Sequence, residues 1–150
     1  MRALVRRVRN AKVLVSEKKV GFIQNGLLIY LGVHSDDQNE DLSWIIKKIL
    51  GLRIFEDGEG RMNRPINSEQ GILLISQFTL FGNLRQGYRP SFNQAANPIT
   101  GKRLYEQGLA QIKEHFHGDV QSGVFGANMQ IHAVDDGPVT IWIDSKDRSY

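Results

Sequence analysis

The chain has 150 residues, a length that suits one domain able to bury about two thirds of the surface that the unfolded chain exposes. It contains no cysteine, which excludes disulfide bonds, thiolate metal sites and a cysteine nucleophile. Its net charge of +3 is compatible with a polyanionic partner such as RNA but is too small to indicate one alone.

The N-terminal segment is basic and extended. Five cations precede the first acidic residue: Arg2, Arg6, Arg7, Arg9 and Lys12. Valines between them favour strands over a cleavable targeting peptide, so two strands are predicted, at residues 2–8 and 12–16, with a turn at Asn10-Ala11. Because Arg6 and Arg7 point to opposite faces, one of them lies on the unfavourable side, where it either reaches solvent at an edge or binds carbonyl groups.

Two further strands and a helix are predicted next. The strands cover residues 20–23 and 27–33. Ser35, with Gln38 three residues later, is typical of the N-cap of a helix that ends at Gly51. Its apolar face repeats at helical spacing through Leu42, Ile45, Ile46 and Ile49. A short strand, a hairpin turn without the ligand spacing of a calcium loop, and an irregular loop then follow at residues 52–55, 57–60 and 61–70.

The centre of the predicted sheet is the apolar run at residues 72–75, which reads as a strand buried on both faces. Three hydrogen-bonding side chains follow it: Ser76, Gln77 and Thr79. Buried polar groups need partners, so these side chains either bond to neighbouring strands and loops or form a ligand site.

The segment at residues 82–97 has no regular period but holds two arginines interleaved with aromatic residues, namely Arg85, Tyr88, Arg89 and Phe92. Such a loop suits either a phosphate with a stacked base, or a segment pinned to the domain by its rings. Asn97-Pro98 then opens a second helix, which ends at Gly118. Its apolar stripe is Tyr105, Leu109, Ile112 and Phe116.

The last third of the chain is predicted as three extended pieces, at residues 120–127, 129–134 and 139–143, with a turn-like sequence at residues 135–138 and His132 on a polar face. The pattern therefore predicts a single α+β domain over residues 1–150, with a mostly antiparallel, barrel-like sheet and two helices on one side. The longest apolar run, residues 26–33, is far short of the roughly 20 residues of a membrane span, so a soluble protein is expected.

Two separated motifs carry a family resemblance. Ser76-Gln77-Phe78-Thr79-Leu80, followed by Gly137-Pro138-Val139-Thr140, resembles the paired signatures of the D-aminoacyl-tRNA deacylases. Agreement covers residues 1–143 and includes Gly51-Leu52-Arg53-Ile54-Phe55, Met62-Asn63, Arg89-Pro90-Ser91-Phe92 and residues 125–130. Residues 144–150 lie outside it, as a C-terminal extension. Asp135 stands where the family usually has Asn, which leaves the hydrogen bonds of this turn open.

The resemblance implies a cytoplasmic homodimer that needs no metal or cofactor and hydrolyses the ester joining a D-amino acid to the 3′ adenosine of tRNA. It implies that the Gly137-Pro138 peptide, cis in the family, enters a pocket of the partner subunit formed by Ser76, Gln77, Phe78 and Thr79. It also suggests that Arg7 holds the inserted Gly-Pro carbonyls and that Met129 lines the adenosine pocket.

For the chemistry, the resemblance allows either a Thr79 nucleophile or catalysis by main-chain groups and the substrate's own 2′-hydroxyl. The second is favoured because no residue is placed by the sequence to activate a threonine, and amides near Phe78 and Thr79 suit a developing oxyanion. A main-chain wall against the substrate's Cα rejects an L side chain but not glycine, so glycyl-tRNA is an expected substrate as well.

Two other hypotheses remain open from the residues alone. The chain is a non-catalytic RNA-binding module that uses the loop at residues 85–92, or it is a conventional esterase with Ser76 or Thr79 as nucleophile and His132 as base. The esterase hypothesis is weak because no Gly-x-Ser-x-Gly elbow surrounds Ser76. His115 and His117 lie two apart without a completing ligand, so no metal site is predicted.

Overall fold

The structure, a computed structural model that describes residues 1–149, is built around a mixed six-stranded sheet. Five strands lie in the order β2-β1-β3-β6-β7, and β8 pairs with β1 along its other edge. Neighbours β3, β6 and β7 run parallel, and the remaining pairs are antiparallel. The strands are β1 (Arg2–Val15), β2 (Lys18–Ile23), β3 (Gly26–Gly32), β6 (Gly71–Ser76), β7 (Asp119–Ser122) and β8 (Gln130–Asp144).

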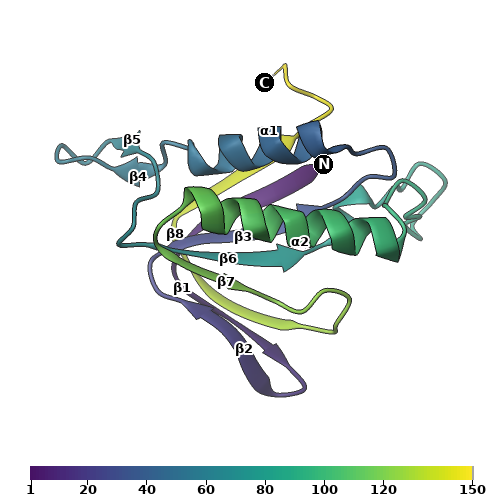
Figure 1. Cartoon of the computed structure of the whole chain (residues 1–150), viewed down its shortest axis with the longest axis horizontal. Helices are drawn as coiled ribbons and strands as arrows, with labels where there is room; N and C mark the ends of the chain where they lie inside the picture. The colour runs from purple at the N-terminus through teal and green to yellow at the C-terminus, as the bar shows by residue number, and fades with distance from the viewer. Residues whose placement is uncertain (150) are drawn as a thin grey trace.

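Two helices, α1 (Asn39–Leu50) and α2 (Pro98–His115), lie side by side against one face of this sheet (Figure 1). The larger core fills the space between, where Ile72 and Leu74 of β6 belong to the same cluster as Leu42 and Leu104 of the helices. The other face of β6, with Leu73 and Ile75, closes a second cluster inside the curled half of the sheet. The predicted α+β fold with a barrel-like sheet and a central strand buried on both faces is confirmed.

Two predicted chain reversals are wrong. Residues 2–15 form one strand instead of two, and residues 130–144 form one strand instead of two joined by a turn. The register of the β1–β8 pair shifts between Arg6 and Val8, and again between Val8 and Asn10. The residues that read as turns therefore form bulges that bend both strands, which lets β1 pair first with β3 and then with β2.

The first helix starts later than predicted, with Gln38 as its N-cap instead of Ser35. Asp37 is the reason, since its carboxylate binds the Met1 ammonium group at 2.6 Å and accepts the His34 amide at 2.6 Å. Asp41 then accepts a hydrogen bond from the Gln38 amide at 3.0 Å. The second helix begins as predicted, with Asn97 Oδ1 accepting the Thr100 amide at 3.0 Å.

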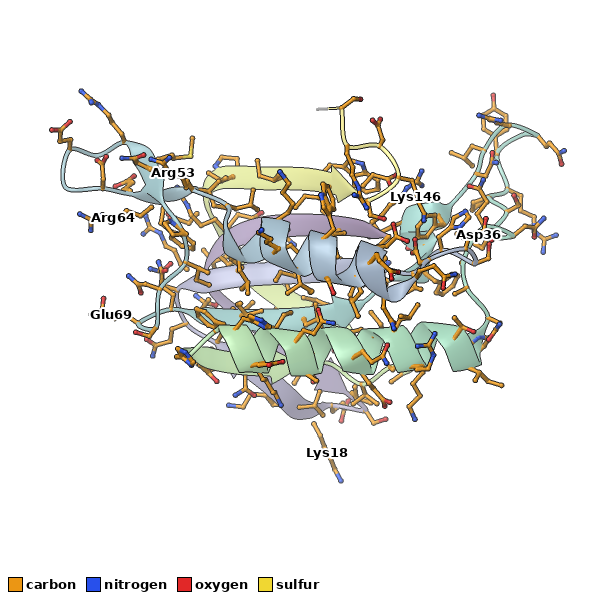
Figure 2. The ribbon with its side chains drawn as sticks, turned by 45° about the horizontal axis from the view of Figure 1, so that its top comes forward. Lys18, Asp36, Arg53, Arg64, Glu69 and Lys146 are labelled. Atoms are coloured by element: carbon orange, nitrogen blue, oxygen red, sulfur yellow. The ribbon has the colours of Figure 1, made fainter. Side chains whose placement is uncertain are left out.

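A small hairpin formed by β4 (Phe55–Glu56) and β5 (Met62–Arg64) projects from the body of the molecule, as Figure 2 shows around Arg53 and Arg64. The predicted hairpin turn is confirmed, but the strand before it is shorter than expected, and part of the predicted loop is a strand. Within residues 1–149, neither helix is long and apolar enough to cross a membrane.

The two ends of the described chain meet in a cluster of charges at the start of α1. Ser145 Oγ accepts a hydrogen bond from the buried Met1 ammonium group at 2.5 Å, and Lys146 Nζ lies 2.7 Å from Asp41 Oδ2. Arg2 pairs with Asp144 at 2.8 Å. Residues that lie beyond the family resemblance thus fasten the C-terminal end of β8 to the first helix; Tyr150 is outside the described residues.

We expect Asp41→Asn to lower stability at neutral pH by about 1 kcal/mol. Burial raises the pKa of Asp41, but hydrogen bonds from Lys146 and from the Gln38 amide outweigh it and lower the pKa below the ordinary 3.8. The stabilisation is therefore complete above about pH 4 and is lost as the pH falls through the folded-state pKa. Thermal unfolding of both proteins from neutral to acidic pH should show their difference narrowing in acid. Glu40→Gln, an exposed neighbour in the same turn, is the matched control and should change stability by a few tenths of a kcal/mol. A constant difference at all pH values would contradict the prediction.

Candidate active site

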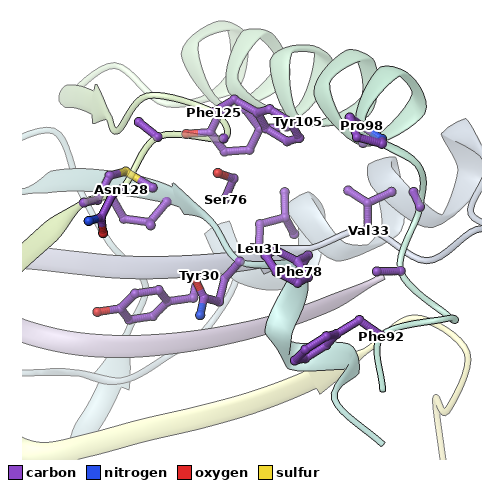
Figure 3. A pocket seen from close by; sticks show the side chains of 18 of the residues that line it. Tyr30, Leu31, Val33, Ser76, Phe78, Phe92, Pro98, Tyr105, Phe125 and Asn128 are labelled. Atoms are coloured by element: carbon purple, nitrogen blue, oxygen red, sulfur yellow. The ribbon is translucent and has the colours of Figure 1, made fainter. Parts of the chain in front are cut away.

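A cavity of about 570 Å³ opens at the carboxyl end of β6, between β3, the start of α2 and residues 125–131 (Figure 3). Its walls are largely apolar and aromatic, with Tyr30, Phe92 and Phe125 among them. The hydrogen-bonding side chains in the lining include Ser76, Gln77 and Asn128. None of the described lining residues is charged or a histidine. The cavity is therefore suited to a flat, largely apolar group held by few hydrogen bonds, and its walls supply no side-chain base.

The predicted Ser76-to-Thr79 motif lies at one wall of this cavity. The Gln77 amide donates to the Leu31 carbonyl at 2.8 Å and so extends the edge of β6 before the chain turns into the short 3-10 helix η1 (Phe78–Phe81). Ser76, Gln77 and Phe78 line the cavity, whereas Thr79 does not. The Thr79 hydroxyl instead accepts a hydrogen bond from Gln77 Nε2 at 2.5 Å. Its neighbour is an amide, which cannot act as a base.

The start of η1 provides main-chain donors beside the cavity. The first N–H groups of a helix have no acceptor within the helix itself, and Phe78 and Thr79 hold these positions. The Phe78 side chain is 58% exposed and packs edge-on against Phe92, with ring centroids 5.1 Å apart. A reacting carbonyl group at this wall would meet amide hydrogens and an aromatic edge.

The opposite wall includes Met129, for which the resemblance suggests a place in the adenosine pocket, and Tyr105, which sequence reasoning placed in the core only. The Tyr105 hydroxyl donates to the Leu74 carbonyl at 2.8 Å. Burial raises the pKa of Tyr105 to about 12, so the phenol stays protonated and serves as a fixed donor. A buried tyrosine needs a hydrogen-bond partner for its hydroxyl group. A tyrosine within an apolar helical stripe is therefore the sequence signal that could have identified Tyr105. Nothing in the pattern of β3 marks Tyr30.

Gly137 and Pro138 lie elsewhere, in the bulge of β8, and neither lines the cavity of its own chain. Both residues are exposed, and the peptide bond between them is cis, as the resemblance implies. Gly137 has φ +121°, and a Cβ placed on it would lie 3.0 Å from the Val139 nitrogen and 3.2 Å from an Arg7 nitrogen. Only glycine fits this backbone without strain.

Three arginines of β1 hold this Gly137-Pro138 corner from behind. Arg6 makes two hydrogen bonds to the Asp135 carboxylate, at 2.9 and 2.7 Å, and Arg9 binds Asp136 at 3.1 Å. The buried Arg7 donates to the carbonyls of Asp136 at 3.3 Å and Ile54 at 2.5 Å. Asp135, which stands where the family usually has Asn, thus forms an ion pair with Arg6. Of the two interpretations of the paired arginines, carbonyl binding is correct for Arg7, although the carbonyls it binds within this chain precede the Gly-Pro pair.

The sequence and the fold are similar to those of known proteins. Residues 4–144 match the model of the family described as D-Tyr-tRNA(Tyr) deacylase. The chain belongs to this family. It is 51% identical over 146 residues to a D-aminoacyl-tRNA deacylase of Thermotoga petrophila, with 97% of each chain covered. It is 48% identical to one of Thermosipho africanus, covering 97% of this chain and 98% of the relative.

Solved structures show the same fold. A c-Myc DNA unwinding element binding protein superposes with a TM-score of 0.91 at 34% identity, covering 96% of this chain and 98% of its own. A probable eukaryotic D-amino acid tRNA deacylase superposes with a TM-score of 0.81 at 20% identity, covering 95% and 97%. Family membership confirms the predicted enzyme class, an ester hydrolase. No group of metal-binding side chains is found among residues 1–149.

We expect Arg7→Met to destabilise the protein by about 3 kcal/mol, because it leaves the Ile54 carbonyl and the Asp136 carboxylate without their buried donor. Urea unfolding measures the change. Arg9→Met is the matched control, since Arg9 binds the same carboxylate at the same distance but its side chain is 74% exposed. The control should cost less than about 1 kcal/mol. Equal losses in the two variants would show that Arg7 has no special role in holding the corner.

Proposed function

We propose that the protein hydrolyses the ester bond between a D-amino acid and the 3′ adenosine of tRNA, as a homodimer in which the Gly137-Pro138 corner of each subunit enters the cavity of the other. Membership of the deacylase family and the names of relatives near 50% identity support the reaction. One observation carries the arrangement: three arginines brace a corner that faces solvent and lines no cavity of its own chain. The cytoplasm, where tRNA is charged, is the compartment this function requires.

An uncovered face of the sheet supports the dimer. Trp142 of β8 is 41% exposed and lies on the same strand as the corner. Leu4 pairs with Trp142 in the β1–β8 ladder and with Tyr30 in the β1–β3 ladder, which continues the apolar surface toward the cavity. An apolar area of this kind, flanked by arginines, is typical of a surface that a second copy covers.

The selection of handedness follows from the rigidity of a main-chain corner. When the corner stands against the substrate's Cα, an L side chain collides with backbone atoms that cannot move, whatever its size. A D side chain points away into open space, so many D-amino acids are accepted. Rejection by such a clash exceeds the roughly 1–3 kcal/mol that a lost methylene contact provides. Glycine has no side chain to collide and is therefore hydrolysed too.

The chemistry rests on main-chain groups and on the substrate. Water attacks the ester carbonyl carbon, the bond to the ribose oxygen breaks, and a free D-amino acid and a tRNA 3′-hydroxyl result. The amides of Phe78 and Thr79 stabilise the developing oxyanion. The 2′-hydroxyl of the terminal ribose orients the water, because no lining side chain among the described residues is charged or a histidine and so able to act as a base.

We expect the wild-type protein to deacylate D-tyrosyl-tRNA and glycyl-tRNA and to leave L-tyrosyl-tRNA intact. Gly137→Ala should reduce D-tyrosyl-tRNA deacylation about 100-fold, since the added Cβ lies 3.0 Å from the Val139 nitrogen and displaces the corner. Release of labelled amino acid from the three matched substrates measures both effects. Gly60→Ala is the control, because Gly60 also has a positive φ, +74°, but has no atom within 4 Å of the added Cβ. Hydrolysis of D- and L-tyrosyl-tRNA at equal rates would refute the proposal.

We expect Thr79→Ala and Ser76→Ala each to retain deacylation within about tenfold of wild type, because neither hydroxyl has a base beside it. Single-turnover rates on D-tyrosyl-tRNA provide the measurement. A true nucleophile loses several orders of magnitude on such a change, so the two mechanisms separate widely. Loss of that size in either variant, with folding unchanged by circular dichroism, would support a conventional esterase instead.

A further inference from the structure

The rim of the cavity belongs to an unusually basic part of the chain. Residues 70–105 contain no aspartate or glutamate but four cations: Arg85, Arg89, Lys102 and Arg103. This stretch includes β6, η1, the loop at residues 82–92 and the first turns of α2, which together form much of the cavity's lining. The chain as a whole carries 16 acids in 150 residues, so the absence of any in this stretch gives the segment that lines much of the cavity a net positive charge.

The loop at residues 82–92 is closed at its base and joined to the cavity. Asn83 and Ser91 exchange two backbone hydrogen bonds, at 2.9 and 3.0 Å. Phe92, the next residue, lines the cavity and packs on Phe78. Figure 1 shows the loop standing out beside the start of α2. Its base is therefore fixed a single residue away from the cavity wall.

The side chains at the tip of this loop make few contacts with the rest of the described chain. Tyr88 is fully exposed, and its ring contacts no other aromatic residue or cation of residues 1–149. The guanidinium groups of Arg85 and Arg89 form no ion pair or hydrogen bond within the same range. By contrast, Arg6, Arg7 and Arg9 each bind a carboxylate. Two free guanidinium groups flanking a free aromatic ring form the combination that binds phosphates and stacks on an unpaired base.

We infer that Arg85, Tyr88 and Arg89 bind the unpaired nucleotides that precede the terminal adenosine of tRNA while that adenosine occupies the cavity. The inference rests on the proposed function for the identity of the RNA. Tyr88 stacks on a base, and the two arginines bind the flanking phosphates. The occupant is single-stranded because a stacking ring needs the open face of a base, which a duplex hides. The second copy of this chain is the poorer fit, since no acidic surface is offered to these cations by the corner, whose carboxylates Asp135 and Asp136 already pair with arginines.

The test separates RNA binding from chemistry by comparing two substrates in the intact protein. One is D-tyrosyl-tRNA, and the other is the D-tyrosyl ester of adenosine, which ends at the cavity. Arg85→Ala/Arg89→Ala should raise KM for D-tyrosyl-tRNA at least tenfold with kcat unchanged, and Tyr88→Ala should raise it about 5- to 150-fold. Both should leave kcat/KM for the adenosine ester unchanged. The arginine variant should also flatten the dependence of log Kd on log salt for uncharged tRNA by about 1.4.

Lys47→Ala/Lys113→Ala is the matched control, because it removes two positive charges from the last turns of α1 and α2, at the other end of the helices. It should change none of these values. Unchanged KM and salt dependence in the loop variants would overturn the inference. An equal loss on the adenosine ester would show that the loop shapes the cavity, and a change in oligomeric state by size exclusion would show that it contacts the second copy; each result also overturns the inference. If the wild type hydrolyses neither substrate, the proposed function fails, while tRNA binding by the loop variants still decides the role of the loop.

Discussion

The pairing of β1 with β8 is the interaction on which the rest of the molecule depends. It runs almost the whole length of both strands, from Arg2 opposite Asp144 to Leu14 opposite Gln130. The shifts in register near Val8 bend both strands at the same level. On β8 the bulge presents Gly137 and Pro138 to solvent, and on β1 it brings consecutive arginines to the carboxylates behind them. The same bulge therefore exposes the corner and brings together the arginines and carboxylates that hold it in place.

The sequence predicted the periodic parts of this fold well, because burial leaves a clear mark on them. Residues 72–75 are apolar on both faces, and their strand is central; the helix opened by Asn97-Pro98 has both its cap and its stripe. The errors occur where the same local residue pattern is compatible with two different structures. Glycine, proline, asparagine and aspartate are favoured in tight turns and in bulges alike, so residues 135–138 read as a reversal although the strand continues through them. Only the partner strand decides between the two.

The residues of the candidate site likewise fall into two groups, those that the sequence could predict and those that it could not. Ser76 and Gln77 could be marked from sequence because polar side chains follow a strand that is buried on both faces, although the same signal also marked Thr79, which does not line the cavity. Phe78 is apolar and was indicated only by the family resemblance. Tyr30, Phe92 and Phe125 could not be grouped, since they come from distant segments and each reads as ordinary core or loop. The Ser35 cap failed for a long-range reason as well. The Met1 ammonium group requires the Asp37 carboxylate, and the helix begins only after this residue.

The placement of charge follows from the cost of removing it from water. A guanidinium group or carboxylate in the apolar cavity would lose its hydration without a partner of fixed geometry, so an uncharged lining is the favourable arrangement for the nucleoside and aminoacyl group that we propose it binds. Excluding charge and bulk water also strengthens the attraction between amide dipoles and a developing oxyanion. Phosphates remain hydrated, so the cations that we infer bind them belong outside, on the exposed loop at residues 82–92. On the proposed function, an apolar cavity, a main-chain corner and a basic rim thus follow from one requirement, that the ester reacts in a site shielded from bulk water while the RNA that carries it stays in water.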